Sequence, residues 1–305
     1  MFIFSDEFLL AAVIAARRRG VNVRVMLNAA RRNGVTENDH VRLALQGADI
    51  EVRDGHPKFE MTHQKSMVID DREAFIASLN WQSGSFSAAR DYALVTTDRQ
   101  EVKEMVACFD ADWTRQEFLA LEDSRLIWCP DNGRHRLVDF IDAARHSLWV
   151  QNERYQDMVI VEGLVRATLR GVKVHILTRP PHTLKPDKLI EGVGGLRILQ
   201  DVGAKVHTMR QLKLHAKAML ADGNRAIVGS INLSPGSFDS RRELAIETSH
   251  GGVVKRLRGT MGHDWTESHV LDLSDLGLLH DLQKRKGLDP RGLFSIRADR
   301  AGNPN

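Results

Sequence analysis

Hydrophobic and polar positions along the chain follow patterns that predict helices and strands in turn. Residues 6 to 19 are expected to form a helix, because Ser5 is a suitable N-cap, acidic residues fill the first turn and three arginines precede Gly20. Apolar and polar residues then alternate from 21 to 27, which predicts a strand. A strand of the same kind is predicted around residues 172 to 176, again after a helix. The pattern therefore indicates a mixed α/β protein.

Two later segments predict hairpins. Residues 66 to 69 and 74 to 80 are expected to be strands on either side of Asp70-Asp71. In the second half of the chain the corresponding turn is Asp222-Gly223, which suits a hairpin because glycine accepts a positive φ. The segment Pro130-Asp131-Asn132-Gly133 predicts a further turn near the junction between the two halves.

The sequence repeats itself over most of its length. The segment that begins at His63 aligns with the one that begins at His215, 152 positions later, and upstream segments align at an offset of 151. Identical pairs at the offset of 152 include His63/His215, Lys65/Lys217, Asp70/Asp222, Ser78/Ser230, Asn80/Asn232, Gly84/Gly236, Ser85/Ser237, Phe86/Phe238 and Arg90/Arg242. Asp91 faces Glu243, and Asp112-Trp113-Thr114 faces Asp264-Trp265-Thr266 in the same register. Chance does not hold register over this length, so we infer an internal duplication.

The first copy begins late relative to the second, because Met1 aligns with Asn152. The amphipathic stretch 134 to 145 and the apolar segment 148 to 150 therefore have no counterpart in the first copy. Either an opening strand and helix were lost, or the coding start lies further upstream. We expect a first lobe over residues 1–124, short at its N-terminus, and a second lobe over 125–274. A C-terminal helix and tail should occupy 275–305, since the last stretch is rich in glycine, proline and charge.

Composition narrows the class of protein. Hydrophobic residues make up 42% and charged residues 27% of the 305 residues, which is typical of a soluble globular protein and excludes a fibrous or disordered chain. The net charge of +3 is small for a protein whose main task is to grip phosphate backbones. Cys108 and Cys129 match neither a metal-binding spacing nor a disulfide framework, so we expect two ordinary buried thiols.

The chain is expected to lack a membrane-spanning segment. Its longest uncharged apolar run, residues 8 to 16, covers nine residues, whereas a bilayer-spanning helix needs about 20. Acidic residues precede this run and arginines follow it, the reverse of the charge order in a signal peptide. We therefore expect a cytoplasmic or peripheral membrane protein, with the true N-terminus left open.

The repeated polar residues have the chemistry of an anion site. Residues two apart on a strand share a face, so His63 with Lys65, and Ser78 with Asn80, form polar pairs that the second copy repeats. Removing such groups from water requires a compensating partner. Lysine supplies positive charge, while serine and asparagine supply neutral donors, and together they suit a tetrahedral phosphate without a metal. Histidine titrates near neutrality and can act as nucleophile or general acid.

Structural explanations compete for several of these residues. Asp70 and Asp222 suit turns at strand ends. Residues 84 to 86 and their copies suit a turn followed by a core aromatic, and the Asp-Trp pairs at 112 and 264 suit packing at a helix end. A single His-x-Lys pair would carry little weight. Its recurrence at matched spacing favours function, because like charges placed so closely are destabilising unless an anion joins them.

In order along the chain, these residues form the motif H-x-K-x4-D, then G-S-x-N, then an acidic residue, and the motif occurs twice. This doubled motif resembles that of the phospholipase D superfamily, and the resemblance spans roughly residues 6 to 266. The second copy, from His215 to Glu243, has every element. The first copy departs at Ala77, where the family usually has glycine, and at Asp91, where it usually has glutamate.

The resemblance implies an α/β fold of two similar α-β-α lobes related by a pseudo-twofold axis, with one active site at their interface. It makes His63 the nucleophile that forms a phosphohistidine and His215 the general acid. Asp91 and Glu243 would each accept a hydrogen bond from the histidine of their own copy. The implied catalytic residues are His63, Lys65, Asp70, His215, Lys217 and Asp222, and the implied phosphate-binding residues are Ser78, Asn80, Ser230 and Asn232. No metal and no cofactor are expected.

Three functions remain open on the sequence. The first is a metal-independent phosphodiesterase that hydrolyses phospholipids or transfers their phosphatidyl group to an alcohol, as a cardiolipin synthase-like enzyme would. The second is a nuclease of the same superfamily, with nucleic acid as substrate. The third is an inactive binding protein, suggested by Ala77, Asp91 and the late start of the first copy.

Two further expectations concern how the chain would work. Because both motifs occur in one chain, we expect activity as a monomer, with peripheral membrane contact. We also expect residues 53 to 62 and 180 to 196 to flank the site and to influence the choice of substrate.

Overall fold

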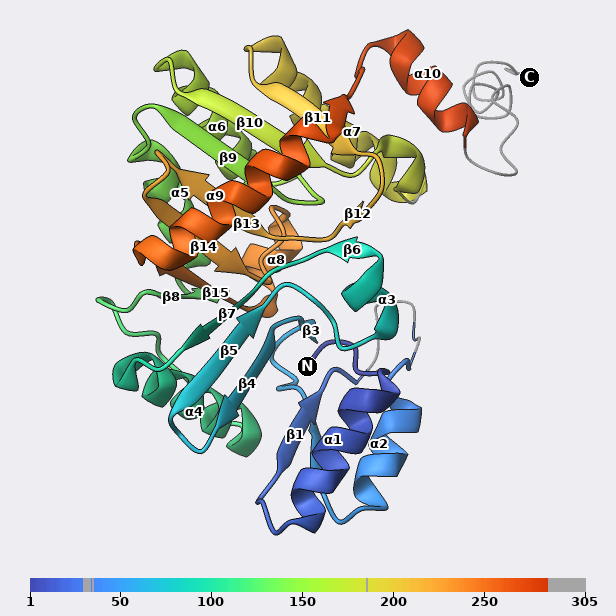
Figure 1. Ribbon diagram of the computed structural model, residues 1–305, viewed down its shortest axis with the longest axis vertical. Coiled ribbons are helices and arrows are strands. Elements are labelled where there is room, and N and C mark those ends of the chain that lie inside the picture. Colours follow the sequence, from blue (N-terminus) through green and yellow to red (C-terminus); the bar gives the residue numbers. More distant parts are fainter. Residues whose placement is uncertain (30–33, 35, 185, 285–305) are drawn as a thin grey trace, which may run out of the picture.

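The computed structural model describes residues 1–29, 34, 36–184 and 186–284, and it is the mixed α/β protein that the sequence predicts. Its two halves stack along the long axis of the molecule (Figure 1). The first half contains α1 (Glu7–Arg18), β1 (Arg24–Leu27), α2 (Asp39–Gln46), β2 (Glu51–Asp54), β3 (Met61–Thr62), β4 (Lys65–Ile69), β5 (Glu73–Ala77), α3 (Ser83–Ser87), β6 (Ala89–Arg90), β7 (Ala93–Thr96) and α4 (Arg99–Thr114).

The second half repeats this order after an additional strand, helix and strand. Its elements are β8 (Leu126–Cys129), α5 (Gly133–Asp142), β9 (Ser147–Gln151), α6 (Met158–Leu169), β10 (Lys173–Thr178), η1 (Pro181–Thr183), α7 (Pro186–Asp201), β11 (Lys205–Met209), β12 (Lys213–Leu214), β13 (Ala218–Ala221), β14 (Arg225–Gly229), α8 (Pro235–Asp239), β15 (Arg241–Thr248), α9 (Gly251–Thr266), β16 (Ser268–Val270) and α10 (Asp275–Gln283). The tail expected from about residue 286 lies outside the described residues.

A nine-stranded sheet forms the middle layer of the second half, in the order β16-β11-β10-β9-β13-β14-β15-β3, with β8 also paired to β15. Side chains alternate between its two faces, as the period of a strand requires. Met219 and Ile227 pack into the large core beneath α5, α6 and α7, whereas Leu220 and Val228 pack against α9 on the opposite face. Helices therefore cover both faces of the sheet (Figure 1), which gives the expected α-β-α layers.

In the first half the strands form two separate sheets, β1-β2 and β4-β5-β7. In the second half β9 joins the equivalent groups, because it pairs with β10 on one side and β13 on the other. The positions 152 before β9 fall ahead of Met1, so no described strand joins the two small sheets. They are held instead by separate cores, and Ile76 and Met105 pack against Trp128 and Leu244 of the second half.

Local predictions are confirmed in outline and corrected in detail. The first helix spans residues 7 to 18, and its N-cap is Asp6 rather than Ser5, since the Asp6 carboxylate accepts a hydrogen bond from the Leu9 amide at 3.0 Å. The strand expected over 21 to 27 begins only at Arg24. Both hairpin turns are present, and Asp222 and Gly223 have φ values of 52° and 67°. Both cysteines are free and buried, as predicted.

No helix among the described residues combines the length and the apolar character needed to cross a bilayer.

Each half lends a short strand to the other. β3, which leads into the first histidine, pairs in parallel with the start of β15, where Met61 faces Arg241. β12, which leads into the second histidine, pairs in the same way with β6, where Lys213 faces Ala89. The two pairings occupy equivalent positions in the repeat, so the exchange is reciprocal.

Two ion pairs lie beside this exchange, one buried and one partly buried. Arg242 binds Asp112 of the first half through two nitrogens at 3.0 and 3.1 Å, and Arg90 binds Asp264 of the second half through two nitrogens at 2.8 Å. The aspartates of the repeated Asp-Trp pairs therefore join the halves, a role that the sequence analysis missed. Their tryptophans do pack at helix ends, as expected, and Trp265 stacks on His207 at a ring-centroid distance of 3.8 Å.

Breaking the Arg242–Asp112 pair is predicted to destabilise the whole protein. The two side chains are 3% and 2% exposed, so Arg242→Gln leaves a buried carboxylate without its cation and lowers the free energy of unfolding by about 3 kcal/mol or more. The matched control is Arg166→Gln, which breaks two partly exposed pairs, with Asp142 and with Glu162, and costs less than about 1 kcal/mol. Urea unfolding of both variants checks this, and equal midpoints would contradict it.

Candidate functional site

The two histidines lie where the halves meet, each at the end of an exchanged strand. The His63 amide donates to the Arg242 carbonyl at 2.9 Å, and the His215 amide donates to the Arg90 carbonyl at 3.1 Å. The backbone of one half thus fixes the histidine of the other. His63 is 7% exposed, and the His215 side chain is 16% exposed.

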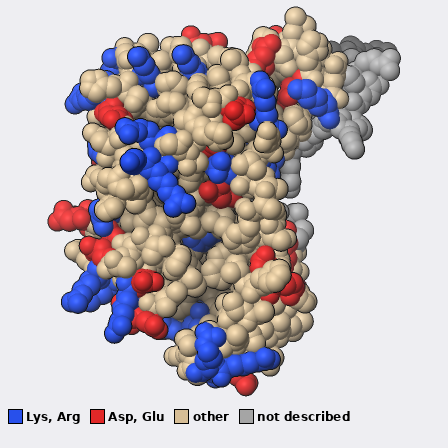
Figure 2. Space-filling model, in the orientation of Figure 1, with Lys and Arg blue, Asp and Glu red and all other residues tan. Residues whose placement is uncertain are grey.

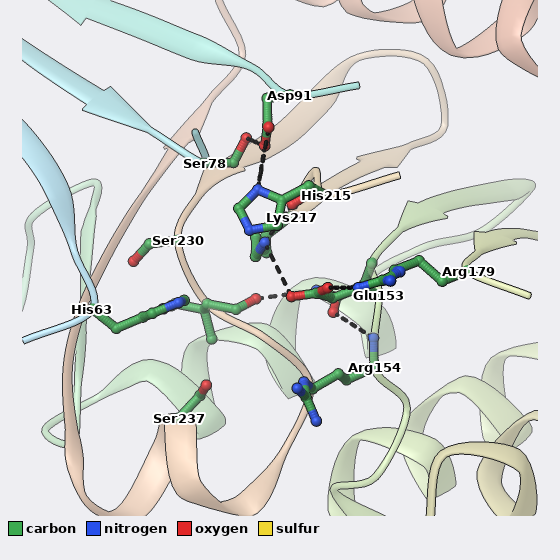
Figure 3. A network of polar contacts seen from close by, with 12 residues as sticks. His63, Ser78, Asp91, Glu153, Arg154, Arg179, His215, Lys217, Ser230 and Ser237 are labelled. Atoms are coloured by element: carbon green, nitrogen blue, oxygen red, sulfur yellow. Dashed lines mark hydrogen bonds and ion pairs between the residues drawn. The ribbon is translucent and has the colours of Figure 1, made fainter. Parts of the chain in front are cut away.

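Each histidine is bound by the carboxylate of the other copy. His63 Nδ1 lies 2.8 and 2.9 Å from the two carboxylate oxygens of Glu243, and His215 Nδ1 lies 2.9 Å from Asp91 Oδ1. Figure 3 shows Asp91 directed at His215. The expectation that each carboxylate serves its own histidine is therefore wrong. The reason is the strand exchange, which carries each histidine next to the acid-bearing strand of the other half.

The predicted phosphate-binding serines bind these carboxylates instead. Ser230 Oγ donates to Glu243 at 2.6 Å, and Ser78 Oγ donates to Asp91 at 2.6 Å. Ser237 adds a second donor to Glu243 at 2.9 Å, and Asp91 lacks an equivalent bond within the described part of the chain. Because a hydroxyl has one proton to donate, Ser78 and Ser230 orient the carboxylates and are corrected as phosphate ligands.

Asn80 and Asn232 are buried at equivalent positions, 5% and 3% exposed. The side-chain oxygen of each has no hydrogen-bond partner within the described residues. An amide that rotates by 180° offers its NH2 group in place of that oxygen, so each asparagine has unused capacity to bind a ligand.

The two lysines are buried next to their own histidines. Lys65 Nζ donates to the His63 carbonyl, and Lys217 Nζ donates to the His215 carbonyl. Burial is the main reason that the pKa of Lys65 lies well below its usual value, and the charge of Lys217 lowers it further. Since Lys217 also lowers the pKa of His63, the charged groups of both copies act on one region.

Both histidines favour the neutral state. Burial lowers the pKa of His63 to about 3, although Glu243 opposes the shift, and burial followed by the charge of Lys217 lowers the pKa of His215. For Glu243, burial alone would raise the pKa, but His63 and Lys65 keep it below its usual value. The result is a neutral imidazole held by a carboxylate, the arrangement that orients a nucleophile or base.

Asp70 and Asp222, expected among the catalytic residues, lie in the hairpin turns. The Asp222 carboxylate accepts hydrogen bonds from the backbone amides of Arg145, His146 and Ser147 at 2.7 to 3.0 Å. Five residues of extended chain, about 16 Å, separate it from Lys217. Asp70 is exposed and has a φ of 52°. Both aspartates therefore shape turns, and their assignment as catalytic is corrected.

Sequence reasoning missed Glu153. Its carboxylate lies 3.5 Å from Lys217 Nζ and 3.2 Å from Arg179, and its side chain is 10% exposed (Figure 3). The available signal was a break in the repeat, because Phe2 stands at the equivalent position 151 residues earlier.

The two segments expected to flank the site differ in how they reach it. Residues 53 to 62 lead through β3 directly to His63. Residues 180 to 196 follow Arg179 and form η1 and part of α7, and the side chains of 185 to 191 lie outside the described residues. Their influence on substrate choice stays a prediction.

The first copy accommodates both of its departures from the motif. A side chain at Gly229 would come within 2.3 Å of the Ala245 backbone, which explains the glycine there. In the first copy the equivalent Ala77 is buried and pairs with Ala93. Asp91 reaches its histidine in spite of its shorter side chain.

Comparison with known proteins agrees with this geometry. The family model described as "Cardiolipin synthase, PLD-like domain" matches residues 1–113 and 137–265. The chain belongs to the phospholipase D-like family. Cardiolipin synthase B of Shigella flexneri and of Escherichia coli K12 are each 28% identical to it over 283 residues, which cover 77% of this chain and 65% of theirs. The chain thus spans slightly less than two thirds of the length of these phospholipase D-like relatives.

Further similarities extend to other phospholipase D-like and related folds. Cardiolipin synthase A of Pseudomonas aeruginosa is 30% identical over 152 residues, which cover 48% of this chain and 30% of that protein. The crystal structure of polyphosphate kinase from Porphyromonas gingivalis matches with a TM-score of 0.67 at 14% identity, over 88% of this chain and 43% of that one. This last similarity concerns the fold alone.

The His63 ring is predicted to stay neutral far below the ordinary histidine pKa. In NMR spectra recorded from pH 8 to pH 5, its ring signals, assigned by their loss in His63→Asn, should keep the shifts of the neutral form. A midpoint near 6.5 would contradict this. Because the folded pKa of about 3 lies below the ordinary value of 6.5, protonation favours unfolding. The contribution of His63 to stability is therefore complete above pH 6.5 and is lost as the pH falls toward 3.

Proposed function

We propose that this chain is a metal-independent phosphatidyltransferase of the phospholipase D type, which transfers the phosphatidyl group of a phospholipid to an alcohol or to water. One observation carries the proposal: at the junction of the halves, two imidazoles are each bound through Nδ1 to a carboxylate of the opposite half, and each has a buried lysine beside it. The similarity to cardiolipin synthases supports a phospholipid substrate.

In the first step, Nε2 of neutral His63 attacks phosphorus, and the bond from phosphorus to the departing alcohol oxygen breaks. His215 donates the proton of its Nε2 to that oxygen, so the head group leaves as a neutral alcohol. Binding an anionic phosphodiester next to His215 raises its proton affinity, which offsets the lowered pKa in the empty site. Lys65 and Lys217 face the charge that develops on the non-bridging oxygens.

In the second step the histidines exchange tasks. His215, now neutral, accepts a proton from the incoming alcohol or water, whose oxygen attacks phosphorus as the P–N bond to His63 breaks. The product carries the phosphatidyl group, His63 returns to its neutral state and His215 regains its proton. The cycle is closed without a metal or an external base.

The contacts of the two histidine-binding carboxylates support His63 as the nucleophile. Glu243, which binds His63, accepts two serine hydroxyls besides the imidazole, whereas Asp91 has the hydroxyl of Ser78. The more fully bound carboxylate orients the more deeply buried ring. A carboxylate held this way fixes the tautomer with its proton on Nδ1 and leaves the Nε2 lone pair free to attack.

The surface charge on the face drawn in Figure 2 favours a lipid over a nucleic acid. On the face drawn in Figure 2, lysines and arginines occur in separate groups with acidic side chains between them. Proteins bind duplex and single-stranded nucleic acids through a continuous basic surface, and this binding therefore depends steeply on salt concentration.

Replacement of either histidine is predicted to abolish turnover. His63→Ala and His215→Ala should each lower kcat by about 10³-fold or more on phosphatidylglycerol vesicles, because attack and protonation need both rings. Wild-type activity should be unchanged in EDTA. His135→Ala, which changes a 77% exposed ring outside the site, is the matched control. Substantial turnover in either site variant, or faster cleavage of single-stranded DNA than of lipid, would contradict the proposal.

Trapping the covalent intermediate is predicted to show that His63 is the nucleophile and His215 the general acid and base. With a radiolabelled phosphodiester whose leaving group needs no protonation, His215→Ala should still form the phosphoenzyme but hydrolyse it slowly, since the base for the second step is missing. Peptide mapping should place the label on His63, and His63→Ala should acquire none. Label on His215 of the wild-type protein would reverse the assignment.

A further inference from the structure

The two halves of the site differ in chemical type at a pair of adjacent equivalent positions. Upstream of the motifs the repeat has an offset of 151, so Glu153 and Arg154 stand where the first copy has Phe2 and Ile3. Glu153 lies by the lysine of the second copy, and Phe2 lies by the lysine of the first. The two copies therefore differ here, with a carboxylate on one side of the site and an aromatic ring on the other.

Phe2 makes its side apolar next to the nucleophile. Its ring packs edge-on against the His63 ring at a centroid distance of 4.7 Å, and Lys65 Nζ lies over it at 4.9 Å. Ile3 follows it and is 4% exposed. This side offers no carboxylate to the ammonium of Lys65 at the position where the second copy offers Glu153 to Lys217.

Glu153 makes the other side an acceptor of hydrogen bonds. Lys217 and Arg179 bind its two oxygens, at 3.5 and 3.2 Å, and a carboxylate accepts about four hydrogen bonds in all. Burial alone would raise the pKa of Glu153, but the charges of Lys217, His215 and its neighbours hold it well below its usual value. An ionised acceptor with unused capacity thus lies within the electrostatic reach of His215.

The chemistry decides which part of a substrate can face this carboxylate. In an in-line displacement the nucleophile and the exchanging alcohol lie on opposite sides of phosphorus, so with His63 attacking, the alcohol lies on the side of His215 and Glu153. Phosphate oxygens carry negative charge and are repelled by Glu153, whereas hydroxyl groups donate to it. A group that faces Glu153 must therefore be a hydrogen-bond donor or a cation, and Lys217 and Arg179 already place two cations against this carboxylate, which disfavours a third.

We propose that Glu153 binds a second hydroxyl of the alcohol that enters and leaves next to His215, and that it thereby selects polyhydric alcohols, such as glycerol-type head groups, over monohydric ones. This inference rests on the proposed function and adds the class of acceptor to it. Glu153 is a specificity-determining residue in this scheme, and it takes no part in the proton transfers that His215 carries out.

A simpler role is charge balance for Lys217. If Glu153 only neutralised this lysine, its loss would change the rate with every acceptor by the same factor. Selection between alcohols is a different quantity, because glycerol, 1-propanol and water compete for one phosphoenzyme. The ratio of their products does not depend on how much of the protein is folded or on the rate of the first step.

The experiment measures this ratio on phosphatidylcholine vesicles with glycerol and 1-propanol present together. Glu153→Gln is expected to lower the ratio of phosphatidylglycerol to phosphatidylpropanol at least about fivefold, because a neutral amide is a weaker acceptor than a carboxylate. Phe2→Leu, at the mirror position, is the matched control and is expected to change the rate but leave the ratio as in the wild type.

Each outcome decides a separate point. An unchanged ratio in Glu153→Gln, with products formed, overturns the inference and leaves the proposed function standing. Absence of every product with the wild-type protein overturns the proposed function itself. If Glu153→Gln makes no product, the ratio is measured in Arg179→Met, which removes a cation that holds Glu153 in place. A fall of at least about twofold supports the inference, and a wild-type ratio overturns it.

Discussion

The whole site depends on the reciprocal exchange of two short strands. β3 and β12 each hold only two residues, yet they bring His63 next to Glu243, 180 positions along the chain, and His215 next to Asp91. His63 and His215 each take their carboxylate from the opposite half, so neither half alone contains a complete pair of the site. The proposed reaction therefore requires the two halves to be held rigidly against each other. A hydrogen bond lengthened by about 1 Å loses most of its orienting effect.

The two Arg–Asp pairs help to hold the halves in the required position. Arg242 and Arg90 immediately precede the two orienting carboxylates, and each reaches across to an aspartate at the end of a helix in the other half. Bidentate guanidinium–carboxylate pairs are directional, so they fix both distance and angle. Docking of the halves and orientation of the histidines thus depend on neighbouring residues of one strand, and a shift of the interface moves both together.

Much of this arrangement follows from the sequence, but its connectivity does not. The repeat, the polar residues at His63 and His215 and the hairpin turns are local patterns, and local patterns can be identified from one chain. A duplicated sequence cannot show whether Asp91 contacts His63 or His215, because both copies present the same residues at the same spacing. The exchange is decided by two-residue strands, which are too short to leave a hydrophobic pattern.

Repetition also misleads when a residue is kept for its backbone. Asp222 repeats Asp70 at the same spacing from the motif lysine, because a tight hairpin needs a residue that tolerates positive φ and accepts hydrogen bonds from nearby amides. Its place in the motif therefore reflects the turn rather than the reaction. Ser78 and Ser230, in contrast, do belong to the site, where they donate hydrogen bonds to the carboxylates that orient the histidines. Recurrence identifies what both halves require, and only the contacts distinguish the scaffold from the chemistry.

In the proposed mechanism the two histidines do different things in the same step, because one ring attacks while the other donates a proton. Two identical environments would give both rings the same proton affinity and would assign neither task to either ring. The differences between the copies fall at the residues next to the rings: Glu243 against Asp91, and Glu153 against Phe2. The shared residues build the frame. In the proposed mechanism the unequal residues give the reaction a direction, since they set which imidazole is more deeply buried and which side of phosphorus presents an acceptor for hydroxyl groups.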